Sequence, residues 1–341
     1  MIFVESCSIM YLLDYKSEKD VYMKTIFIIN PCAGQGNKTD ALIDKINRMS
    51  YNDVEIYITK AVGDATRYVR GYCRTYGGAR FIACGGDGTF SEVLNGVVGC
   101  DDAEIGVIPI GTGNDFCRNF ISDSSFEDID AQINGESVKC DAIRYTTETD
   151  KGIISGYCAN MFNIGFDCNV ADLTSKMKTK PLISGSMAYL LSIFTTLITK
   201  KGANLKIDMD GAEMHRGKLL LTSIANGCYC GGGIKSNPLA SIRDGRINVN
   251  IVKNVSRTRF LYLFPYYMKG TFLKLKNIHK VVHSTNCREM VVTPIDGAMR
   301  ICVDGEIIDA GRSRFEICPE AFNFVIPGVR KKNIALDKIL V

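Results

Sequence analysis

Three short loops, each rich in glycine and small polar residues, could bind phosphate. Residues 30–36 read Asn-Pro-Cys-Ala-Gly-Gln-Gly, residues 85–89 read Gly-Gly-Asp-Gly-Thr, and residues 109–115 read Pro-Ile-Gly-Thr-Gly-Asn-Asp. Glycines let the backbone turn sharply and approach a phosphate closely, and a helix that begins at such a loop offers unpaired N–H groups. Because ligands of open parallel sheets bind outside the carboxyl ends of the strands, the three loops predict one nucleotide-sized pocket.

Two other phosphate-binding motifs are absent. The residues around Lys38 are Gly-Asn-Lys-Thr, which lacks the Gly-Lys-Ser/Thr of a P-loop. Gly34 and Gly36 are followed by Thr39 where the dinucleotide-binding fingerprint has its third glycine. The pocket is therefore neither of these binders, and ordinary turn chemistry is the alternative for each loop taken alone.

Residues 303–306, Val-Asp-Gly-Glu, place two carboxylates at a turn. Asp-Gly between apolar alternations is typical of a tight hairpin, and the second part of the chain has three more such pairs, at 210–211, 244–245 and 296–297. A hairpin is therefore the simplest interpretation. Phosphoryl transfer to a hydroxyl, however, needs a carboxylate to accept the proton and a metal to offset charge between phosphate oxygens.

The loops follow short apolar runs that are typical of buried strands. In the first part of the chain these runs alternate with segments of helical spacing, which predicts an α/β domain with a parallel sheet covered by helices on both faces. After residue 139 strands dominate, so a mainly antiparallel domain is expected, with helices near 168–199 and 256–269. The expected strands of the first part are 25–29, 54–58, 80–84 and 105–108, and its helices are 39–49, 64–76 and 89–97.

Length and composition describe a globular protein of two domains. Of 341 residues, 46% are hydrophobic and 23% charged, which excludes intrinsic disorder, collagen-like repeats and a coiled coil. The net charge of +4 does not by itself indicate nucleic acid. Three histidines without an HExxH motif exclude the zinc hydrolases of that kind, and fourteen cysteines without a CxxC pair are expected to be reduced thiols of a cytosolic protein.

Two segments have features of targeting or membrane sequences. Residues 1–22 lack a basic start and a small-residue cleavage site, so an N-terminal extension is expected there. Residues 181–199 carry no charge, but six of them are Ser or Thr, and the apolar residues between Met187 and Leu197 follow the spacing of one helical stripe. A soluble helix is therefore favoured over a membrane span.

In this order and spacing, the three loops and the 303–306 turn resemble the diacylglycerol kinase catalytic family, most closely its soluble bacterial lipid kinases. The resemblance covers about residues 24 to 326 and includes Glu92, Asn95 and Gly96 after the second loop. In the second part it includes Asn-Ile-Gly-Phe-Asp at 163–167, Ala-Asn-Gly at 225–227, Gly-Gly-Gly-Ile-Lys-Ser-Asn-Pro at 231–238, and the turns at 244–245 and 303–306.

The resemblance implies a nucleotide domain, a β-sandwich-like domain and an active site in the cleft between them. We expect an ATP-binding domain over 23–139, onto which the tail 322–341 packs back, and a lipid-binding catalytic domain over 140–321. Diacylglycerol would be phosphorylated to phosphatidate, with Glu306 as general base and Asp304 orienting it or sharing its role. The ATP-binding positions implied by the family are Asn30, Pro31, Gly34, Gly85, Gly86, Asp87, Gly88, Thr89, Glu92, Gly111, Thr112, Asn114 and Asp115.

The same resemblance implies Mg, both with ATP and at a structural site. The ligands of the structural site would be Ser241, Asp244 and the backbone carbonyl of Arg246, since Mg takes oxygen ligands and several waters. A plain turn is the alternative. Arg243 departs from the second acid that family members often carry there.

Residues 245–288 contain nine Lys or Arg and no Asp or Glu, with aromatic residues among them. This pattern suits the surface of an anionic membrane, and a solvated basic face over core aromatics is the alternative. We expect a cytoplasmic protein in peripheral, reversible contact with the inner membrane face and without a nucleic acid partner; a homodimer is left open. Alternatives to the reaction are phosphorylation of a sphingoid or long-chain acylglycerol, an NAD kinase, and a non-catalytic nucleotide-responsive protein that binds membranes.

Overall fold

The computed structural model describes residues 23–34, 38–49, 51, 53–121, 125–165 and 202–328. The expected extension 1–22, the expected helix 168–199 with its uncharged run, and the end of the tail from residue 329 lie outside the described residues. None of the helices within these ranges has the length and apolar character needed to cross a bilayer.

The first domain contains a parallel sheet in the strand order β2-β1-β3-β4. Its elements lie close to their expected bounds, because short apolar runs and helical spacing alternate without interruption here. The strands are β1 (Thr25–Ile29), β2 (Val54–Ile58), β3 (Arg80–Gly85) and β4 (Glu104–Pro109). The helices are α1 (Lys38–Asn47), α2 (Asp64–Tyr76), α3 (Asp87–Val97), the one-turn η1 (Phe116–Asn119) and α4 (Ile129–Asn134).

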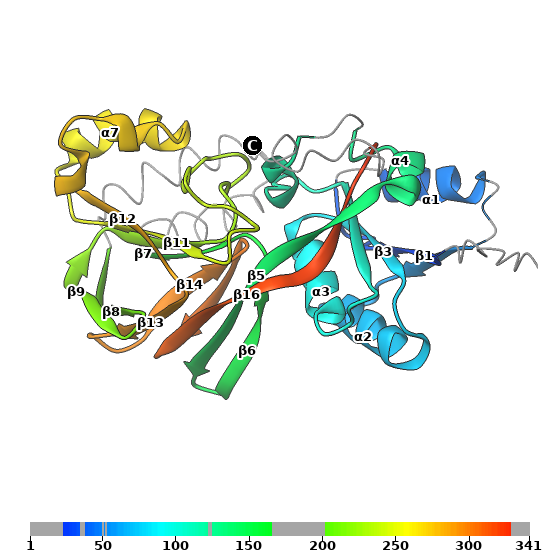
Figure 1. Ribbon diagram of the computed structural model, residues 1–341, viewed down its shortest axis with the longest axis horizontal. Coiled ribbons are helices and arrows are strands. Elements are labelled where there is room, and N and C mark those ends of the chain that lie inside the picture. The colour runs from blue at the N-terminus through cyan, green and yellow to red at the C-terminus, as the bar shows by residue number, and fades with distance from the viewer. Residues whose placement is uncertain are drawn as a thin grey trace, which may run out of the picture.

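Helices cover both faces of this sheet, as Figure 1 shows. Alternate residues of β1 serve the two layers: Ile26 and Ile28 pack in the cluster with α2 and α3, and Phe27 and Ile29 pack in the cluster with α1 and α4. Every residue of β1 is therefore buried, which is why the strand is a continuous apolar run rather than an alternating one.

Two long strands, β5 (Glu136–Thr149) and β16 (Ser313–Ile326), join the two halves of the molecule. They pair with each other antiparallel, and β16 also pairs with β4 in parallel and with β13 of the second half. The two halves consequently share one ten-stranded sheet, which Figure 1 shows crossing between them. Residue 139, where the sequence pattern changes, lies inside β5.

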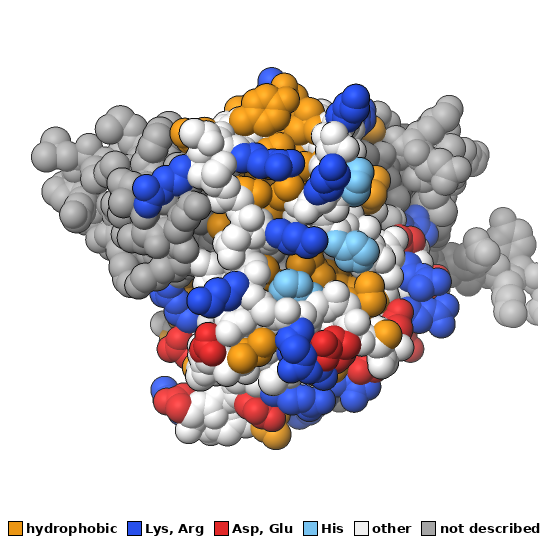
Figure 2. All heavy atoms as spheres, turned by 90° about the vertical axis from the view of Figure 1, so that its left-hand side faces the viewer, with side chains coloured by type: hydrophobic (Ala, Val, Ile, Leu, Met, Phe, Trp, Pro, Cys, Tyr) orange, Lys and Arg blue, Asp and Glu red, His pale blue; other side chains and the backbone are white. Residues whose placement is uncertain are grey.

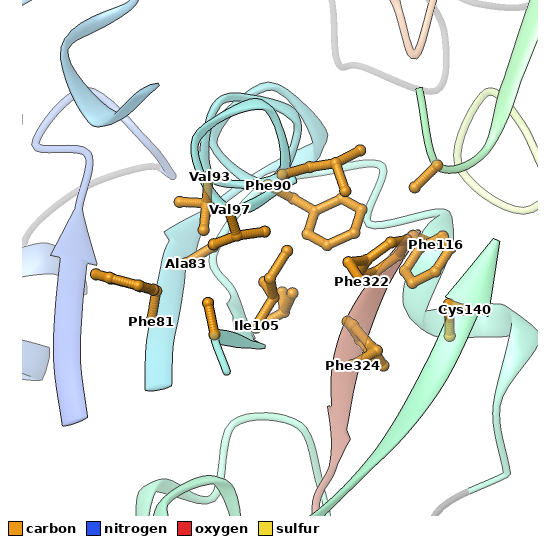
Figure 3. Packing of buried hydrophobic residues seen from close by; sticks show 14 of the residues in the cluster. Phe81, Ala83, Phe90, Val93, Val97, Ile105, Phe116, Cys140, Phe322 and Phe324 are labelled. Atoms are coloured by element: carbon orange, nitrogen blue, oxygen red, sulfur yellow. The ribbon is translucent and has the colours of Figure 1, made fainter. Parts of the chain in front are cut away.

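Aromatic side chains from distant parts of the chain pack beneath α3, as Figure 3 shows. Phe90 of α3 stacks on Phe116 of η1 with ring centroids 4.7 Å apart, and Phe116 meets Phe324 of β16 edge to face at 4.9 Å. Aromatic pairs in these geometries stabilise packing beyond the apolar area that they bury. The C-terminal end of β16 thus completes the core of the first domain.

The second domain is a sandwich of two sheets, and its antiparallel character confirms the expectation. One sheet has the order β12-β11-β10-β7-β14-β15, and the other is the shared sheet. The expected helix near 256–269 is α7 (Arg257–Met268). The remaining elements are β6 (Gly152–Cys158), β7 (Met161–Gly165), β8 (Ala203–Met209), β9 (Ala212–Leu219), β10 (Leu221–Ala225), β11 (Ile247–Val252), η2 (Phe272–Lys274), η3 (Ile278–Lys280), β12 (Val282–Cys287), β13 (Glu289–Pro294), β14 (Met299–Val303) and β15 (Glu306–Ala310).

Only two of the four Asp-Gly pairs form the tight hairpin that the sequence predicts. Residues 210–211 join β8 to β9 and residues 304–305 join β14 to β15, with positive φ at both positions of each turn. The expectation is wrong for the other two. Residues 296–297 connect β13 to β14, which belong to different sheets, and residues 244–245 end a long loop before β11.

Candidate active site

The carboxylate of Asp87, where α3 begins, connects two of the loops of the site. Its two oxygens accept the backbone N–H groups of Asn114 and Asp115, each at 2.8 Å. Gly113, the residue before Asn114, has no room for a side chain, since a Cβ there would be 2.4 Å from Asp87 Oδ2. Asp87 therefore folds the loop after β4 onto the loop after β3.

The loop after β1 meets the same place. The Asn30 side-chain amide donates to Thr89 Oγ1 at 3.2 Å, and Asn30 Oδ1 accepts the N–H of Cys32 at 2.9 Å. Gly34 has φ +81°, and a Cβ on it would be 2.6 Å from a methyl carbon of Ile110. The positive φ and the close approach of Ile110 explain why glycine is required in this loop.

The second and third loops approach each other backbone to backbone. A Cβ on Gly111 would lie 2.5 Å from the Cα of Gly86, and the N–H groups of Ile110 and Gly111 both donate to the carbonyl of Gly85. All three glycine-rich loops are therefore brought together at the carboxyl ends of β1, β3 and β4. This arrangement is the one that the sequence predicts for a nucleotide pocket.

Glu92 is used differently from its expected role as an ATP-binding residue. Its two carboxylate oxygens accept the N–H groups of Gly63 and Ala65, at 2.8 and 3.1 Å, where α2 begins. A carboxylate at a helix N-terminus satisfies orphan N–H donors and is favoured by the helix dipole. In this structure Glu92 fixes α2 against α3, and its role in ATP binding stays a prediction.

The β14–β15 turn of the second domain carries the two predicted catalytic carboxylates. Asp304 adopts φ +44°, its backbone pairs with Met161, and its Oδ1 accepts the Met161 N–H at 3.0 Å. Glu306 is exposed, and its Oε1 lies 3.4 Å from the point that a Cβ on Gly88 would occupy. The turn thus places Glu306 against the first turn of α3, in the other domain.

Negative charge accumulates between the two domains. Burial, together with the carboxylates of Asp87 and Asp115, raises the pKa of Asp304 to about 7 against the lowering effect of the Met161 N–H. Burial likewise raises the pKa of Asp115 to about 6, again with a contribution from Asp87. Since each ionised carboxylate disfavours the next, a cation or a set of protons stabilises this cluster.

Asp115 also ties the two domains together. Both of its oxygens accept the N–H of Gly232, at 3.0 Å, from the glycine-rich loop of the second domain. The guanidinium of Arg118 lies 3.6 Å from Asp115 Oδ1 and donates to the carbonyl of Gly113 at 3.3 Å. The sequence reasoning missed Arg118, although its spacing of three residues from Asp115 is one turn of a helix.

A second link between the domains comes from Asn95 of α3. Its amide donates to the carbonyl of Tyr157 in β6 at 2.9 Å, and its Oδ1 accepts the Tyr157 N–H at 2.8 Å. This reciprocal pair replaces a strand partner that β6 lacks on that side. Asn95 therefore positions the helix that begins at Asp87 relative to the second domain.

The loop that was expected to hold a structural metal is closed by two carboxylates. Asp244 Oδ1 accepts the N–H of Arg246 at 3.0 Å, and the buried Asp141 accepts the N–H groups of Gly245 and Glu320 at 2.7 and 2.8 Å. Burial raises the pKa of Asp244, and the nearby Asp141 carboxylate raises it further. Asp141, which the sequence reasoning missed, is thus a second acid beside Asp244.

This pair of acids fits a cation only with help from other oxygens. Within the described ranges no three His, Cys, Asp or Glu side chains gather where they could hold a metal ion. A Mg²⁺ at Asp244 would accordingly take Ser241, the Arg246 carbonyl and water as its remaining ligands. Such a ligand set is compatible with Mg²⁺, which commonly keeps several waters.

Comparison with known proteins agrees with this architecture. Residues 24–145 match the diacylglycerol kinase catalytic domain, and residues 160–326 match the YegS C-terminal NAD kinase beta sandwich-like domain. Residues 24–145 belong to the diacylglycerol kinase catalytic domain family. This family consists of kinases. The two matches confirm the resemblance that was inferred from the loops, and they confirm the expected fold class.

Individual members of the family align over most of the chain. A diacylglycerol kinase of Mycobacterium tuberculosis is 28% identical over 268 residues, covering 76% of this chain and 84% of the relative. The lipid kinase YegS of Escherichia coli is 30% identical over 204 residues, covering 58% and 64%. The crystal structure of a diacylglycerol kinase from Bacillus anthracis has the same fold, with a TM-score of 0.66 at 20% identity over 91% of this chain and 99% of that one.

Proposed function

We propose that this kinase transfers the γ-phosphoryl group of ATP to the free hydroxyl of diacylglycerol, giving phosphatidate and ADP. The observation that carries the proposal is the position of Glu306 against Gly88, at the N-terminus of α3. A helix N-terminus that follows a glycine-rich loop binds phosphate, and a carboxylate beside it can accept a proton from an attacking hydroxyl.

ATP occupies the three loops in this proposal. Asn30, Thr89 and the N–H groups of the two glycine loops contact the nucleotide, whereas Asp87 acts by holding the loop 111–115 in shape. Arg118 supplies positive charge beside the phosphates, because its guanidinium lies 3.6 Å from Asp115 Oδ1 and donates to the carbonyl of Gly113 in the third loop. The other expected ATP positions, apart from Glu92, are retained on the same grounds.

The chemical step needs one proton acceptor. The lipid hydroxyl oxygen forms a bond to the γ-phosphorus, the bond from that phosphorus to the bridging oxygen breaks, and ADP leaves with the bond electrons. Glu306 takes the hydroxyl proton, and Asp304, held by the Met161 N–H, orients Glu306 or shares this role. Positioning and charge stabilisation provide most of the remaining catalysis in phosphoryl transfer.

Magnesium is proposed at two places, neither of which supplies a step of its own. With ATP, it would neutralise phosphate charge close to Asp304 and Asp115, whose pKa values are raised by burial and by neighbouring carboxylates. In the loop before β11 it would bind Asp244, Ser241 and the Arg246 carbonyl and stabilise the loop.

The family and the site also allow related substrates. Relatives in the family are named diacylglycerol kinases and lipid kinases, which favours a lipid over NAD. Among lipids, a sphingoid or a long-chain acylglycerol offers the same hydroxyl, so these are the closest alternatives to diacylglycerol. A membrane lipid as substrate also favours action at the inner membrane face, and a homodimer is left open.

The deciding experiment offers ATP and a panel of acceptors to the full-length protein. Mixed micelles of diacylglycerol, a sphingoid base or a monoacylglycerol are run beside soluble NAD, and phosphate incorporation is measured for each. Phosphatidate as the main product supports the proposal. Transfer only to another lipid changes the substrate, transfer only to NAD overturns the proposal, and saturable ADP binding without any transfer supports the non-catalytic alternative.

A further inference from the structure

One face of the second domain combines positive charge with exposed apolar side chains. It is built from α7, η2, η3 and β12, which follow one another along the chain. Residues 245–288 include all four and contain nine Lys or Arg and no Asp or Glu. Figure 2 shows apolar, Lys and Arg side chains sharing the upper part of this face, with the acidic side chains lower down.

Helix α7 has apolar side chains on its solvent side as well as on its inner side. The inner side packs in a cluster in which Phe260 of α7 joins Phe272 of η2 and Val282 of β12. On the other side, Leu261 is 50% exposed and Tyr262 is 60% exposed. Packing within the chain therefore accounts for Phe260 and leaves Leu261 and Tyr262 in contact with water.

Basic side chains surround these apolar ones. Lys269 follows the C-terminus of α7, Lys274 and Lys276 lie in and after η2, and Lys280 ends η3; all four are exposed. Exposed apolar residues bordered by lysines, without an acidic neighbour in the segment, are typical of surfaces that bind the boundary between lipid headgroups and acyl chains.

We propose that this α7 face, defined by Leu261, Tyr262, Met268, Lys274, Lys276 and Lys280, docks on the surface of an anionic phospholipid bilayer. The lysines are attracted by the negative surface potential, and the apolar side chains enter the headgroup boundary. The inference deepens the proposed function, and it rests on that function in taking the substrate to be a membrane lipid.

The α7 face is connected to the nucleotide loops through a short path. The carbonyl of Met268, at the end of α7, accepts the N–H of Lys235 at 3.1 Å. Gly270 packs on the Lys235 side chain, and Gly232 of the same loop donates to both oxygens of Asp115. Docking through α7 therefore places the membrane on an element that is hydrogen-bonded to the loop contacting the active site.

The test is co-flotation of the full-length protein with vesicles of two compositions. One is phosphatidylcholine alone, and the other contains phosphatidylcholine and phosphatidylglycerol in equal parts. We expect binding to the anionic vesicles, weakened roughly tenfold or more in the pair Lys276→Glu/Lys280→Glu and also reduced in Leu261→Ser/Tyr262→Ser. Added salt should weaken the binding of the wild-type protein.

Matched controls lie in the β5–β6 hairpin, which Figure 1 shows at the bottom of the molecule, away from α7 at the upper left. Lys151→Glu reverses an exposed charge, and Ile153→Ser removes an apolar side chain that is 73% exposed. Both should float with anionic vesicles as the wild-type protein does. Equal loss of binding in the controls and the α7 variants would overturn the proposal, as would unchanged binding of the α7 variants.

Two further outcomes separate this surface from the proposed reaction. Activity toward a short-chain diacylglycerol in neutral detergent micelles should be unchanged in the α7 variants, because the active site is intact. If no lipid is phosphorylated but vesicle binding still depends on α7, the reaction fails and the surface stands. If the protein ignores vesicles and instead binds duplex DNA through the same lysines, the face is a nucleic acid site and the proposal fails.

Discussion

Glu306 of the β14–β15 turn lies with Oε1 3.4 Å from the point that a Cβ on Gly88 would occupy, although the two residues belong to different domains. The contact joins the proposed proton acceptor to the helix N-terminus at which a phosphate would bind. It exists because β5 and β16 hold both domains on one sheet. Four predictions concern this site and the loops around it.

Replacing the proposed base should slow chemistry without weakening ATP binding. Glu306→Gln keeps the size of the side chain but cannot accept the proton, so kcat should fall roughly 10²–10⁴-fold. The control is Asp309→Asn, an exposed acid on the same strand, which should leave kcat unchanged. Steady-state kinetics with diacylglycerol micelles and calorimetry with ADP give the two readouts; near-normal turnover of Glu306→Gln would remove Glu306 from the base role.

Filling the space at Gly113 should open the nucleotide loop. A Cβ there would lie 2.4 Å from Asp87 Oδ2, so Gly113→Ala displaces a carboxylate that accepts two backbone N–H groups. Each such bond contributes about 1.5–3 kcal/mol, so the Kd for ADP should rise at least about tenfold. Gly71→Ala, in α2 with no atom near its Cβ, should bind ADP normally and gain up to about 1 kcal/mol in the free energy of unfolding. Equal ADP affinities would contradict the role given to Asp87.

The raised pKa of Asp304 predicts that its contribution to stability falls as the pH rises, whereas a carboxylate with a lowered pKa loses its contribution as the pH falls. It is about 7 in the folded protein and about 4 in the unfolded chain, so between these values the folded state holds a proton that the unfolded state releases. This contribution to the free energy of unfolding is therefore present below pH of about 4 and is lost as the pH rises to about 7.

Asp304→Asn should remove that loss. Its Tm should exceed that of the wild-type protein by roughly 2–4 °C at alkaline pH and match it in acid, because Asn keeps the turn and the acceptor for Met161. The control is Asp210→Asn in the equivalent turn of β8 and β9, an exposed residue, which should show no such gain. A constant difference in Tm at all pH values would argue against charge as the cause.

Magnesium should stabilise the loop before β11 in the absence of nucleotide. Binding to the folded state alone raises Tm with Mg²⁺ concentration, and Asp244→Asn should abolish that rise by removing the carboxylate ligand that the proposal assigns to the metal. The control is Asp296→Asn, which changes another exposed Asp-Gly pair and should retain the rise in Tm with Mg²⁺ concentration. No rise in the wild-type protein would show that Asp141 and the backbone close this loop without a metal.

The local structural elements of this protein could be predicted from its amino-acid sequence. The glycine-rich loops, the alternation of apolar runs with helical spacing in residues 25–109, and helix α7 follow from backbone freedom and hydrophobic periodicity, which act over a few residues. The same spacing carried the resemblance to the family. These features could be read correctly because nothing distant in the chain is needed to form them.

The pairing of residues far apart in the chain depends on the tertiary structure and could not be predicted from local patterns. Glu92 looks like part of the phosphate loop, yet it binds the start of α2. Residues 296–297 join strands of different sheets and residues 244–245 end a long loop before β11, so neither Asp-Gly pair forms a hairpin. The contacts of Asp115 with Gly232 and of Glu306 with Gly88 depend on β5 and β16 crossing both domains. Long-range strand pairing of this kind is set by the packing of the whole core, which a local sequence pattern does not predict.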